Sequence, residues 1–423
     1  MIKRSFFTLS KPKLHYSLIE PGYKEPESIP VPSDLILLLN ESIDNKKEML
    51  LKKDQAVEKG EKLSLYEDSS EYVVCPVSGK ITGIDIYSDN MGKVSTRLII
   101  KKEQIQSSDS PSKAYDLTED AACADSFLRN LPGAPPLRAF ANSSAKVDTI
   151  VITGADSDLS CCTCQYVALN YIDKINAGAK ILKQITKAGK ICMTIPEQLH
   201  YPEEPDMAQV IRTSMVYPSN QPAMILKDHL GMVLPAGQTP EDLGVYFISP
   251  EAVVSLANAY ETQTAGFEKI VTIIGKQGLV SCVKATIGTP LKKIFDTFGI
   301  QINEQDRIII GGPMQGVATF TQDHPVQADT DTVIIQDREI IPELSDNACV
   351  NCGRCVQICP ANIPVNLLVR YLEADHYEEA ADKFDLESCI ECGLCAYTCL
   401  ARIPLFQYIK LGKHELLKLR ADA

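Results

Sequence analysis

The feature that most constrains this chain is a pair of cysteine runs near its C-terminal end. Eight of the 15 cysteines in the 423 residues lie in these runs, and each run has the pattern C-x2-C-x2-C-x3-C. The second run, which begins at Cys389, repeats the first, which begins at Cys349, at an offset of 40 residues. An Ile-Pro pair follows each run at the same distance, at 363–364 and at 403–404. The chain therefore contains an internal duplication built around cysteine.

The spacing within each run predicts iron–sulfur ligation. Three thiolates that are two residues apart can surround one face of a small iron–sulfur cube, whereas the fourth points away and ligates the other cube. We therefore expect two [4Fe–4S] clusters with crossed ligands, the first on Cys349, Cys352, Cys355 and Cys399 and the second on Cys389, Cys392, Cys395 and Cys359. The alternative is a pair of zinc sites, although zinc is typically held by paired C-x2-C units with a longer loop between them. Two clusters in one small module indicate electron transfer, because a structural role needs only one.

The segment between the two runs predicts helices. Residues 365–372 and 377–384 carry apolar residues at helical spacing, and Pro364 is well placed to open the first helix. Gly353 and Gly393 each follow a second cysteine, where a missing side chain lets backbone N–H groups approach the sulfurs. We expect a helical two-cluster ferredoxin domain over residues 340–423.

Composition and charge exclude several classes of protein. Hydrophobic residues make up 45% and charged residues 23%, which is typical of globular chains. A net charge of -13 without a basic run argues against nucleic-acid binding. No apolar run approaches the roughly 18 residues of a membrane span. The start of the chain is basic and then only briefly apolar, so we expect no secretory signal and a cytoplasmic protein. In that reducing compartment the cysteines do not indicate a disulfide framework.

The N-terminal third predicts a small β-rich unit. Within residues 34–100, short apolar runs are broken by glycine turns, a pattern that looks like the biotinyl/lipoyl-type hammerhead. The nearest candidate for a carrier lysine, in Met91-Gly92-Lys93, does not match the carrier motif, so we expect a structural hammerhead within residues 1–105. Residues 101–120 are polar and rich in serine and predict a linker.

Residues 121–262 predict an α/β domain. Apolar strands at 149–153 and 191–195 alternate with helical segments. One helix is expected over 165–175 and to stop at Gly178, and another over 253–260 with its start at Ser249. This alternation favours a largely parallel sheet.

Residues 263–335 predict a smaller α+β unit. Strands at 269–275 and 307–312 flank a helix through Leu291 and Phe298. The unit includes the turn G-G-P-M-Q-G at 311–316, to which we assign no catalytic meaning.

The order of these parts resembles the RnfC family, whose members are subunits of the Rnf electron-transport complex, over nearly the whole chain. The middle portions are also similar to the NADH-binding flavoprotein subunit of respiratory complex I. The most specific segments of the resemblance are residues 75–79, 311–316, 349–364 and 389–399. It implies a multidomain α/β and α+β fold, with a barrel-sandwich hammerhead, a Rossmann-like α/β domain, a β-grasp unit of the SLBB type and the ferredoxin domain. In that family the middle domain holds FMN and receives hydride from NADH, and anaerobic metabolism is the usual setting.

The chain departs from the family where the flavin would bind. A family segment G-x-G-G-A-x-F-P corresponds to L-P-G-A-P-P-L-R at 131–138, where prolines replace glycines that would cradle a phosphate. N-G-A-E-C-E-P-Y has become T-G-A-D-S-D-L-S at 153–160, and Y-P-x-G-G-E has become Y-P-S-N-Q-P at 217–222. We therefore expect an FMN/NADH site that has degenerated. By the resemblance, its remaining candidate residues are Gly133, Gly154, Asp156 and Asp158.

Several other residues leave alternatives open. Cys161, Cys162 and Cys164 lie where the family's nucleotide loop would be. They are either redox-active, part of a cluster that another chain completes, or partly buried thiols at a helix start. Cys75, Cys123, Cys192 and Cys282 are isolated, as buried free cysteines often are. His15 corresponds to a histidine-proline segment of the family, and we expect it to be a surface or packing residue. The arginines at 354, 370 and 402 either offset the negative charge of the clusters or face solvent.

Three functions remain in competition. The first is an electron-transfer subunit of an oxidoreductase complex, which relays electrons between redox partners such as flavoprotein, ferredoxin or membrane subunits. The second is an NADH dehydrogenase with FMN in the α/β domain. The third is an architectural subunit whose clusters lie off the main electron path. We expect the first, and with it a component of a catalyst rather than a complete enzyme.

Overall fold

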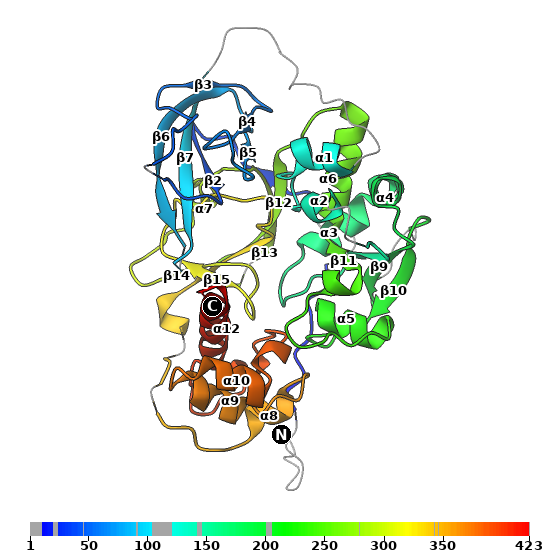
Figure 1. Ribbon diagram of the computed structural model, residues 1–423, viewed down its shortest axis with the longest axis vertical. Coiled ribbons are helices and arrows are strands. Elements are labelled where there is room, and N and C mark those ends of the chain that lie inside the picture. Colours follow the sequence, from blue (N-terminus) through cyan, green and yellow to red (C-terminus); the bar gives the residue numbers. More distant parts are fainter. Residues whose placement is uncertain are drawn as a thin grey trace.

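The computed structural model describes residues 11–19, 24–44, 46–89, 92–103, 121–141, 146–199, 205–278, 280–341, 343–345 and 347–422. Figure 1 shows four parts: a β-rich unit coloured blue, an α/β unit coloured cyan to green, a mixed sheet in green to yellow, and a helical unit in orange and red. The start of the chain, Met91 and the predicted linker beyond residue 103 lie outside the described residues.

The N-terminal unit is a barrel-like sandwich of two small sheets. Four antiparallel strands lie in the order β2 (Asp34–Leu39), β7 (Val94–Lys102), β6 (Gly79–Ser88) and β3 (Ala56–Val57). The second sheet pairs β4 (Lys62–Leu63) with β5 (Val73–Val74). Alternate residues of β2 and β7, among them Leu35 and Ile100, are buried between the two sheets. This is the β-rich unit that the glycine-broken pattern predicted.

The α/β unit contains a parallel sheet of four strands. Its order is β10 (Gln209–Thr213), β9 (Lys190–Pro196), β8 (Thr149–Thr153) and β11 (Val245–Ile248). The near-continuous apolar runs of β8 and β9 fit strands that are covered on both faces. The strand order reverses next to β8, so the carboxyl ends of β8 and β11 border the crevice where ligands bind in open α/β sheets.

The α/β unit also contains helices, which alternate with the strands along residues 121–262. They are α1 (Ala121–Leu128), α2 (Leu137–Ala141), α3 (Thr163–Asn170), α4 (Ile172–Thr186), α5 (Pro222–His229) and α6 (Pro250–Thr262). The start of α6 follows the predicted capping, because the Ser249 hydroxyl accepts a hydrogen bond of 3.1 Å from the backbone N–H of Ala252.

The predicted end of a helix at Gly178 is wrong. Gly178 lies in the middle of α4, where a Cβ would be 2.3 Å from the carbonyl oxygen of Val253 in α6. The glycine therefore serves the close approach of α4 to α6. The helix breaks earlier, at Tyr171, which separates α3 from α4.

A mixed sheet of six strands occupies the centre of the molecule (Figure 1). The order is β1 (Glu27–Ser28), β13 (Val280–Thr286), β12 (Glu268–Ile274), β16 (Thr332–Gln336), β14 (Arg307–Ile310) and β15 (Val317–Thr319). Its middle pair, β12 and β16, is parallel, and α7 (Leu291–Phe298) packs on it through Leu291, Ile294 and Phe295. Because β1 precedes the sandwich in the sequence, the chain enters this sheet before it forms the N-terminal unit.

The C-terminal unit is helical. It contains α8 (Arg354–Ile358), α9 (Val365–Leu372), α10 (Tyr377–Phe384), α11 (Leu394–Tyr397) and α12 (Leu405–Asp422), with a short 3-10 turn at 386–388. Two further 3-10 turns precede this unit in the sequence, at 240–243 and 338–340. Helices α9 and α10 cover the two predicted segments, and Pro364 directly precedes α9. Gly412 lets α12 approach α9, since a Cβ there would be 2.5 Å from the side chain of Leu372. None of the helices in the described residues is both long and apolar enough to cross a membrane.

The tight contact at Gly178 gives a first prediction. We expect Gly178→Ala to lower the free energy of unfolding by about 1–3 kcal/mol, because overpacking against the α6 backbone outweighs the gain in helix propensity of roughly 1 kcal/mol. Denaturant unfolding of the full chain measures the effect. Lys180→Ala, at an exposed position of the same helix, is the control and should change stability little. An increase in stability for Gly178→Ala would contradict this account of the helix contact.

Candidate iron–sulfur centre

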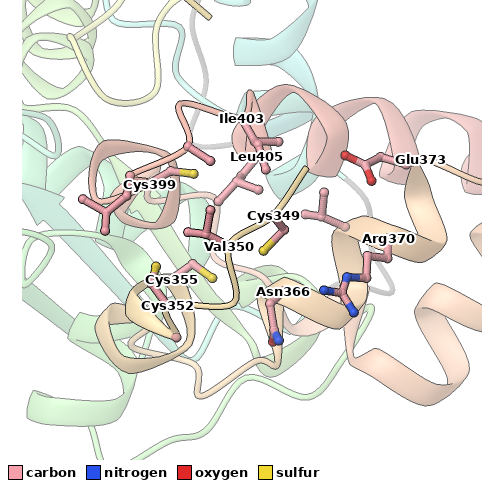
Figure 2. Close-up of a pocket in the computed structure, with 14 residues that line it drawn as sticks. Cys349, Val350, Cys352, Cys355, Asn366, Arg370, Glu373, Cys399, Ile403 and Leu405 are labelled. Atoms are coloured by element: carbon pink, nitrogen blue, oxygen red, sulfur yellow. The ribbon is translucent and has the colours of Figure 1, made fainter. Parts of the chain in front are cut away.

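The four cysteines that we expected to hold the first cluster line one cavity. They come from three segments: Cys349 and Cys352 from the loop before α8, Cys355 from α8, and Cys399 from the loop after α11. Figure 2 shows their sulfurs around a shared space, with Asn366, Arg370 and Glu373 contributed by α9 and its end. The rest of the lining is largely apolar and includes Val350, Ile403 and Leu405.

The other four cysteines line a second cavity. Cys359 from the first run meets Cys389, Cys392 and Cys395 from the second, against Leu368, Phe406 and Ile409. Each cavity thus combines three cysteines of one run with the fourth of the other, which is the grouping that the spacing predicted. Among the described residues, no three Cys, His, Asp or Glu side chains are gathered tightly enough to hold a single metal ion. Four thiolates around an apolar space fit an iron–sulfur cube, and the assignment of the eight as ligands stays a prediction.

The two glycines inside the runs have a geometric reason that differs from the predicted one. Gly353 and Gly393 directly precede α8 and α11 with φ of 72° and 73°, in the left-handed region that favours glycine. A Cβ on Gly393 would also be 2.7 Å from the carbonyl oxygen of Met314. The glycine of the second run therefore lets the ferredoxin-like unit pack against the 311–316 turn.

Burial differs between the two sets of thiols. In the second set, burial raises the pKa of Cys392 to about 12 and raises the pKa of Cys389 and Cys395 as well. In the first set, burial raises the pKa of Cys355. Because iron binds the thiolate, cluster assembly must displace these protons. The second set is the more enclosed of the two.

Two tyrosines lie over the second set. The hydroxyl of Tyr217 donates a hydrogen bond of 2.7 Å to the carbonyl oxygen of Cys392 and accepts one of 2.9 Å from the Gln221 amide. The ring of Tyr16 packs against Tyr217 with centroids 5.6 Å apart, and the backbone N–H of Asn220 donates to the Tyr16 hydroxyl. Together with Met215, these rings form an apolar layer between the second set and the carboxyl edge of the parallel sheet.

The N-terminal segment reaches this layer by backbone pairing. His15 forms a bridge with Val216, and the backbone N–H of Tyr16 donates to Met215 at 3.0 Å. His15 is exposed, which agrees with the expectation of a surface residue, and its backbone forms the bridge. Tyr217 opens the Y-P-S-N-Q-P segment that the resemblance singled out, but nothing in the sequence indicated that either tyrosine lies over the second cysteine set.

Asp156 caps helix α3 from within the chain. Its carboxylate accepts hydrogen bonds from the backbone N–H groups of Cys164, at 2.9 Å, and Gln165, at 3.2 Å, and from the Gln165 side chain at 3.0 Å. This helix N-terminus follows the first strand of the sheet, where a phosphate group binds in dinucleotide folds. The anion-binding N–H groups are thus already paired with a carboxylate of the protein.

Asp158 holds the 311–316 turn. It accepts hydrogen bonds from the backbone N–H groups of Met314, at 3.1 Å, and Gln315, at 2.7 Å. A Cβ on Gly312 would be 2.3 Å from the carboxyl carbon of Asp158, so only glycine fits there. The turn to which we assigned no catalytic meaning is therefore a docking element between the α/β unit and the mixed sheet.

Gly133 and Gly154 are also placed by packing. A Cβ on Gly133 would be 2.3 Å from the backbone nitrogen of Ala252, and the Gly133 carbonyl accepts a hydrogen bond from the Ser249 hydroxyl. A Cβ on Gly154 would be 2.5 Å from the carbonyl oxygen of Thr194. These two glycines, Asp156 and Asp158 are the four candidate residues of the FMN/NADH site. Each of them makes its contacts with other parts of the chain.

The three cysteines at the start of α3 are buried thiols. Burial raises the pKa of Cys161 and of Cys164 well above the ordinary value. The sulfur of Cys162 lies 3.5 Å from that of Cys282 in β13, across the boundary between the α/β unit and the mixed sheet. This is the environment of inert packing cysteines rather than of activated thiolates.

A buried ion network crosses the same boundary. Lys269 in β12 is fully buried, and its ammonium group pairs with Glu251 of α6 and, at 2.7 Å, with Asp331 just before β16. The carbonyl oxygen of Asp331 accepts hydrogen bonds from the Thr163 hydroxyl and the Thr272 backbone. Sequence reasoning missed this network, because a lysine within an apolar strand gives no signal of its partners.

Comparison with known proteins finds two family models that match separate parts of the chain. Residues 341–400 match a family model described as a 4Fe-4S dicluster domain, which covers all eight cysteines of the two runs. Residues 23–104 match the RnfC barrel sandwich hybrid domain, which covers the N-terminal unit. The chain thus has the dicluster domain of iron–sulfur proteins, and the two models support iron–sulfur clusters in an RnfC-type arrangement.

Curated relatives give the same result. The chain is 29% identical over 280 residues to the C subunit of the proton-translocating ferredoxin:NAD(+) oxidoreductase complex of Clostridium ljungdahlii, covering 64% of this chain and 61% of that protein. It is 26% identical over 422 residues to the C subunit of the ion-translocating oxidoreductase complex of Edwardsiella ictaluri, covering 93% of this chain and 52% of the relative. The equivalent protein of Buchnera aphidicola is 23% identical over 377 residues, with 85% and 79% covered. The chain is therefore similar to the C subunits of Rnf-type complexes over most of its length.

Two of these relatives extend well beyond the match, since the chain spans 61% and 52% of their lengths. Among solved structures, an NAD+-reducing [NiFe]-hydrogenase in the H2-reduced state is similar with a TM-score of 0.44 and 13% identity, covering 72% of this chain and 62% of the hydrogenase chain. A likeness this distant carries no argument about function.

Asp156 gives a prediction about pH. Burial raises its pKa from the ordinary value of 3.8 to about 6, so between these values the folded state keeps a proton that the unfolded state releases. This contribution to stability is fully present below the unfolded pKa and is lost as pH rises through the folded pKa. We expect the free energy of unfolding to fall by about 1 kcal/mol from pH 5 to pH 7 through this group, and Asp156→Asn to remove that share.

The measurement is denaturant unfolding at both pH values for the wild type and the variant. Asp296→Asn, at an exposed position of α7, is the control and should keep the wild-type slope. The same slope in Asp156→Asn as in the wild type would show that this carboxyl is ionised in the fold throughout the range.

Proposed function

We propose that this chain is an iron–sulfur electron-transfer subunit of an RnfC-like multi-subunit oxidoreductase complex. The observation that carries the proposal is the pairing of two four-cysteine cavities within one helical unit, each of which combines cysteines of both runs. Cys349, Cys352, Cys355 and Cys399 would hold one [4Fe–4S] cluster, and Cys389, Cys392, Cys395 and Cys359 the other. When bound, such clusters accept and release single electrons. The protein supplies the spacing and the apolar enclosure that set the reduction potentials.

The finer description of the fold belongs to this proposal. The strand order of the parallel sheet, with its reversal next to β8, supports a Rossmann-like α/β domain over residues 121–262. The parallel pair β12 and β16 with helix α7 supports a β-grasp unit of the SLBB type over residues 263–335. The other units would be a hammerhead within residues 1–105 and the ferredoxin domain over residues 340–423.

The relay that we propose has no flavin. A bound FMN would need N–H donors for its phosphate, and Asp156 already occupies those at the start of α3. The Tyr16 hydroxyl accepts a hydrogen bond from the backbone N–H of Asn220 near this edge of the sheet, and Gly133 is packed against α6. These contacts favour the relay over the alternative of an FMN-containing NADH dehydrogenase subunit.

The partners follow from the relatives. Their names describe subunits of ion-translocating and ferredoxin:NAD(+) oxidoreductase complexes. By the same role, this chain would pass electrons between other redox subunits and would lie at the cytoplasmic face of the membrane through contacts with partner subunits.

Cofactor content tests the relay. Anaerobically purified full-length chain should contain about eight irons with matching sulfide and no stoichiometric flavin, because two cubes carry four irons each. The measurement is joint quantitation of iron, acid-labile sulfide and released flavin. One FMN per chain would refute the flavin-free interpretation of the crevice, and stoichiometric zinc without sulfide would refute the clusters.

Single substitutions test the crossed ligands. Cys359→Ala should lose the same cluster as Cys389→Ala, with iron falling from about eight to about four, because both thiols line the second cavity. The EPR spectra of these two reduced variants should agree with each other and differ from that of Cys349→Ala. Cys192→Ala, a buried cysteine of β9, should keep full iron and is the control. If Cys359→Ala matched Cys349→Ala instead, the ligands would not be crossed.

A further inference from the structure

The surface over the first cysteine set carries exposed apolar side chains. Val350 is 63% exposed and Leu400 is 56% exposed, although both line the cavity of the first set. Tyr397, two residues before the ligand candidate Cys399, is 58% exposed, and Leu367 of α9, which follows the cavity-lining Asn366 in the sequence, is 39% exposed. We call these four residues, with the three arginines described next, the Val350 face. Apolar side chains that gather in this way on a surface mark an interaction site.

Three arginines accompany these residues. Arg370 lines the same cavity. Arg354 and Arg402 do not line it, but each lies in the sequence between two residues that do. All three are exposed, and none forms an ion pair with an acidic side chain of the described chain. Arg370 donates a hydrogen bond of 2.6 Å to Asn351, while Glu373 is the acidic side chain among the residues that line the cavity. On a chain of net charge -13, this is a local excess of positive charge.

The two cavities differ in their access to partners. Cys392 of the second set belongs to the apolar layer with Tyr16 and Tyr217, which separates it from solvent. Three cysteines of the first set, Cys349, Cys352 and Cys399, are only partly buried, against two of the second set, Cys359 and Cys389. The first set is therefore the less enclosed of the two, and the Val350 face is the surface over it.

We propose that the Val350 face is the docking surface for an acidic electron-carrier protein that exchanges electrons with the first cluster. This inference rests on the proposed function, since it assigns a surface to the relay. Charge complementarity selects the partner: three exposed guanidinium groups suit carboxylates, and the apolar centre suits the apolar surface around a redox centre of a carrier protein. A membrane surface is disfavoured because the apolar residues come from short loops and helix ends around a cavity rather than from one amphipathic helix.

Electrostatic steering makes the proposal measurable. Association of oppositely charged proteins is accelerated about tenfold or more at low ionic strength and slows as salt is added. The probe is a reduced plant-type [2Fe–2S] ferredoxin, an acidic carrier, mixed anaerobically with the oxidised full-length chain in a stopped-flow spectrometer. We expect the triple variant Arg354→Glu, Arg370→Glu, Arg402→Glu to react at least about tenfold more slowly than the wild type and to lose the salt dependence.

Two controls separate docking from damage. Reduction by dithionite-generated methyl viologen radical, a small cation that needs no docking surface, should be at least as fast in the single variants Arg354→Glu and Arg402→Glu as in the wild type, because the added carboxylates attract the cation. Arg307→Glu, at an exposed position of β14 in the mixed sheet, lies outside the ferredoxin-like unit and should react with ferredoxin like the wild type. If the triple variant loses iron, the single variants Arg354→Gln and Arg402→Gln carry the test, each with a smaller loss of rate and unchanged viologen reduction.

The outcomes distinguish the two proposals. An unchanged ferredoxin rate in iron-replete variants would overturn the docking surface and leave the relay standing. Flotation of the wild type with vesicles of anionic phospholipid, lost in the triple variant, would instead identify the Val350 face as a membrane contact and overturn the proposal. A wild-type chain without iron, which the viologen radical does not reduce, would refute the relay itself.

Discussion

The ammonium group of Lys269, buried between two units of the fold, is the interaction on which the arrangement of the molecule depends. A charge without water must be paired, and the pairing reaches Glu251 in the α/β unit and Asp331 beside the central strand β16. Removing one partner from such a network typically costs about 3–5 kcal/mol, so the two units are locked as one piece. Asp158 of the α/β unit also binds the 311–316 turn through the backbone N–H of Gln315. Gly393 of the second cysteine run packs against the same turn at Met314.

The same contacts account for the state of the crevice at the carboxyl edge of the parallel sheet. In folds of this kind, helix N-termini and loop N–H groups at this edge are available to a nucleotide. Here a carboxylate caps α3, and an N-terminal segment pairs with the loop after β10 and brings Tyr16 into the edge. The N–H groups at the start of α3 are thus satisfied within the chain, and these contacts favour a structural use of this edge of the sheet.

The two cysteine sets have different environments as a result of this arrangement. The second set is enclosed by the tyrosine layer and by the 311–316 turn, which lowers its exposure to solvent and raises the pKa of its thiols. The first set lies nearer to solvent, behind exposed apolar and cationic side chains. In the relay that we propose, these environments would tune the two clusters differently, because solvent exposure and local charge both shift cluster potentials.

The sequence by itself determined the features whose cause is local. The spacing of the eight cysteines predicted which of them share a cavity, Ser249 predicted the start of α6, and strand β8 was predicted residue for residue. Only the tertiary structure decided what depends on contacts between distant residues. Gly178 was predicted to end a helix, but it packs against Val253 within one. Lys269 opens a predicted apolar strand, and nothing in the sequence names Glu251 and Asp331 as its partners. The role of Asp156 was equally beyond sequence reasoning, because a carboxylate that binds a ligand and one that caps a helix differ only in which N–H groups the fold brings to it.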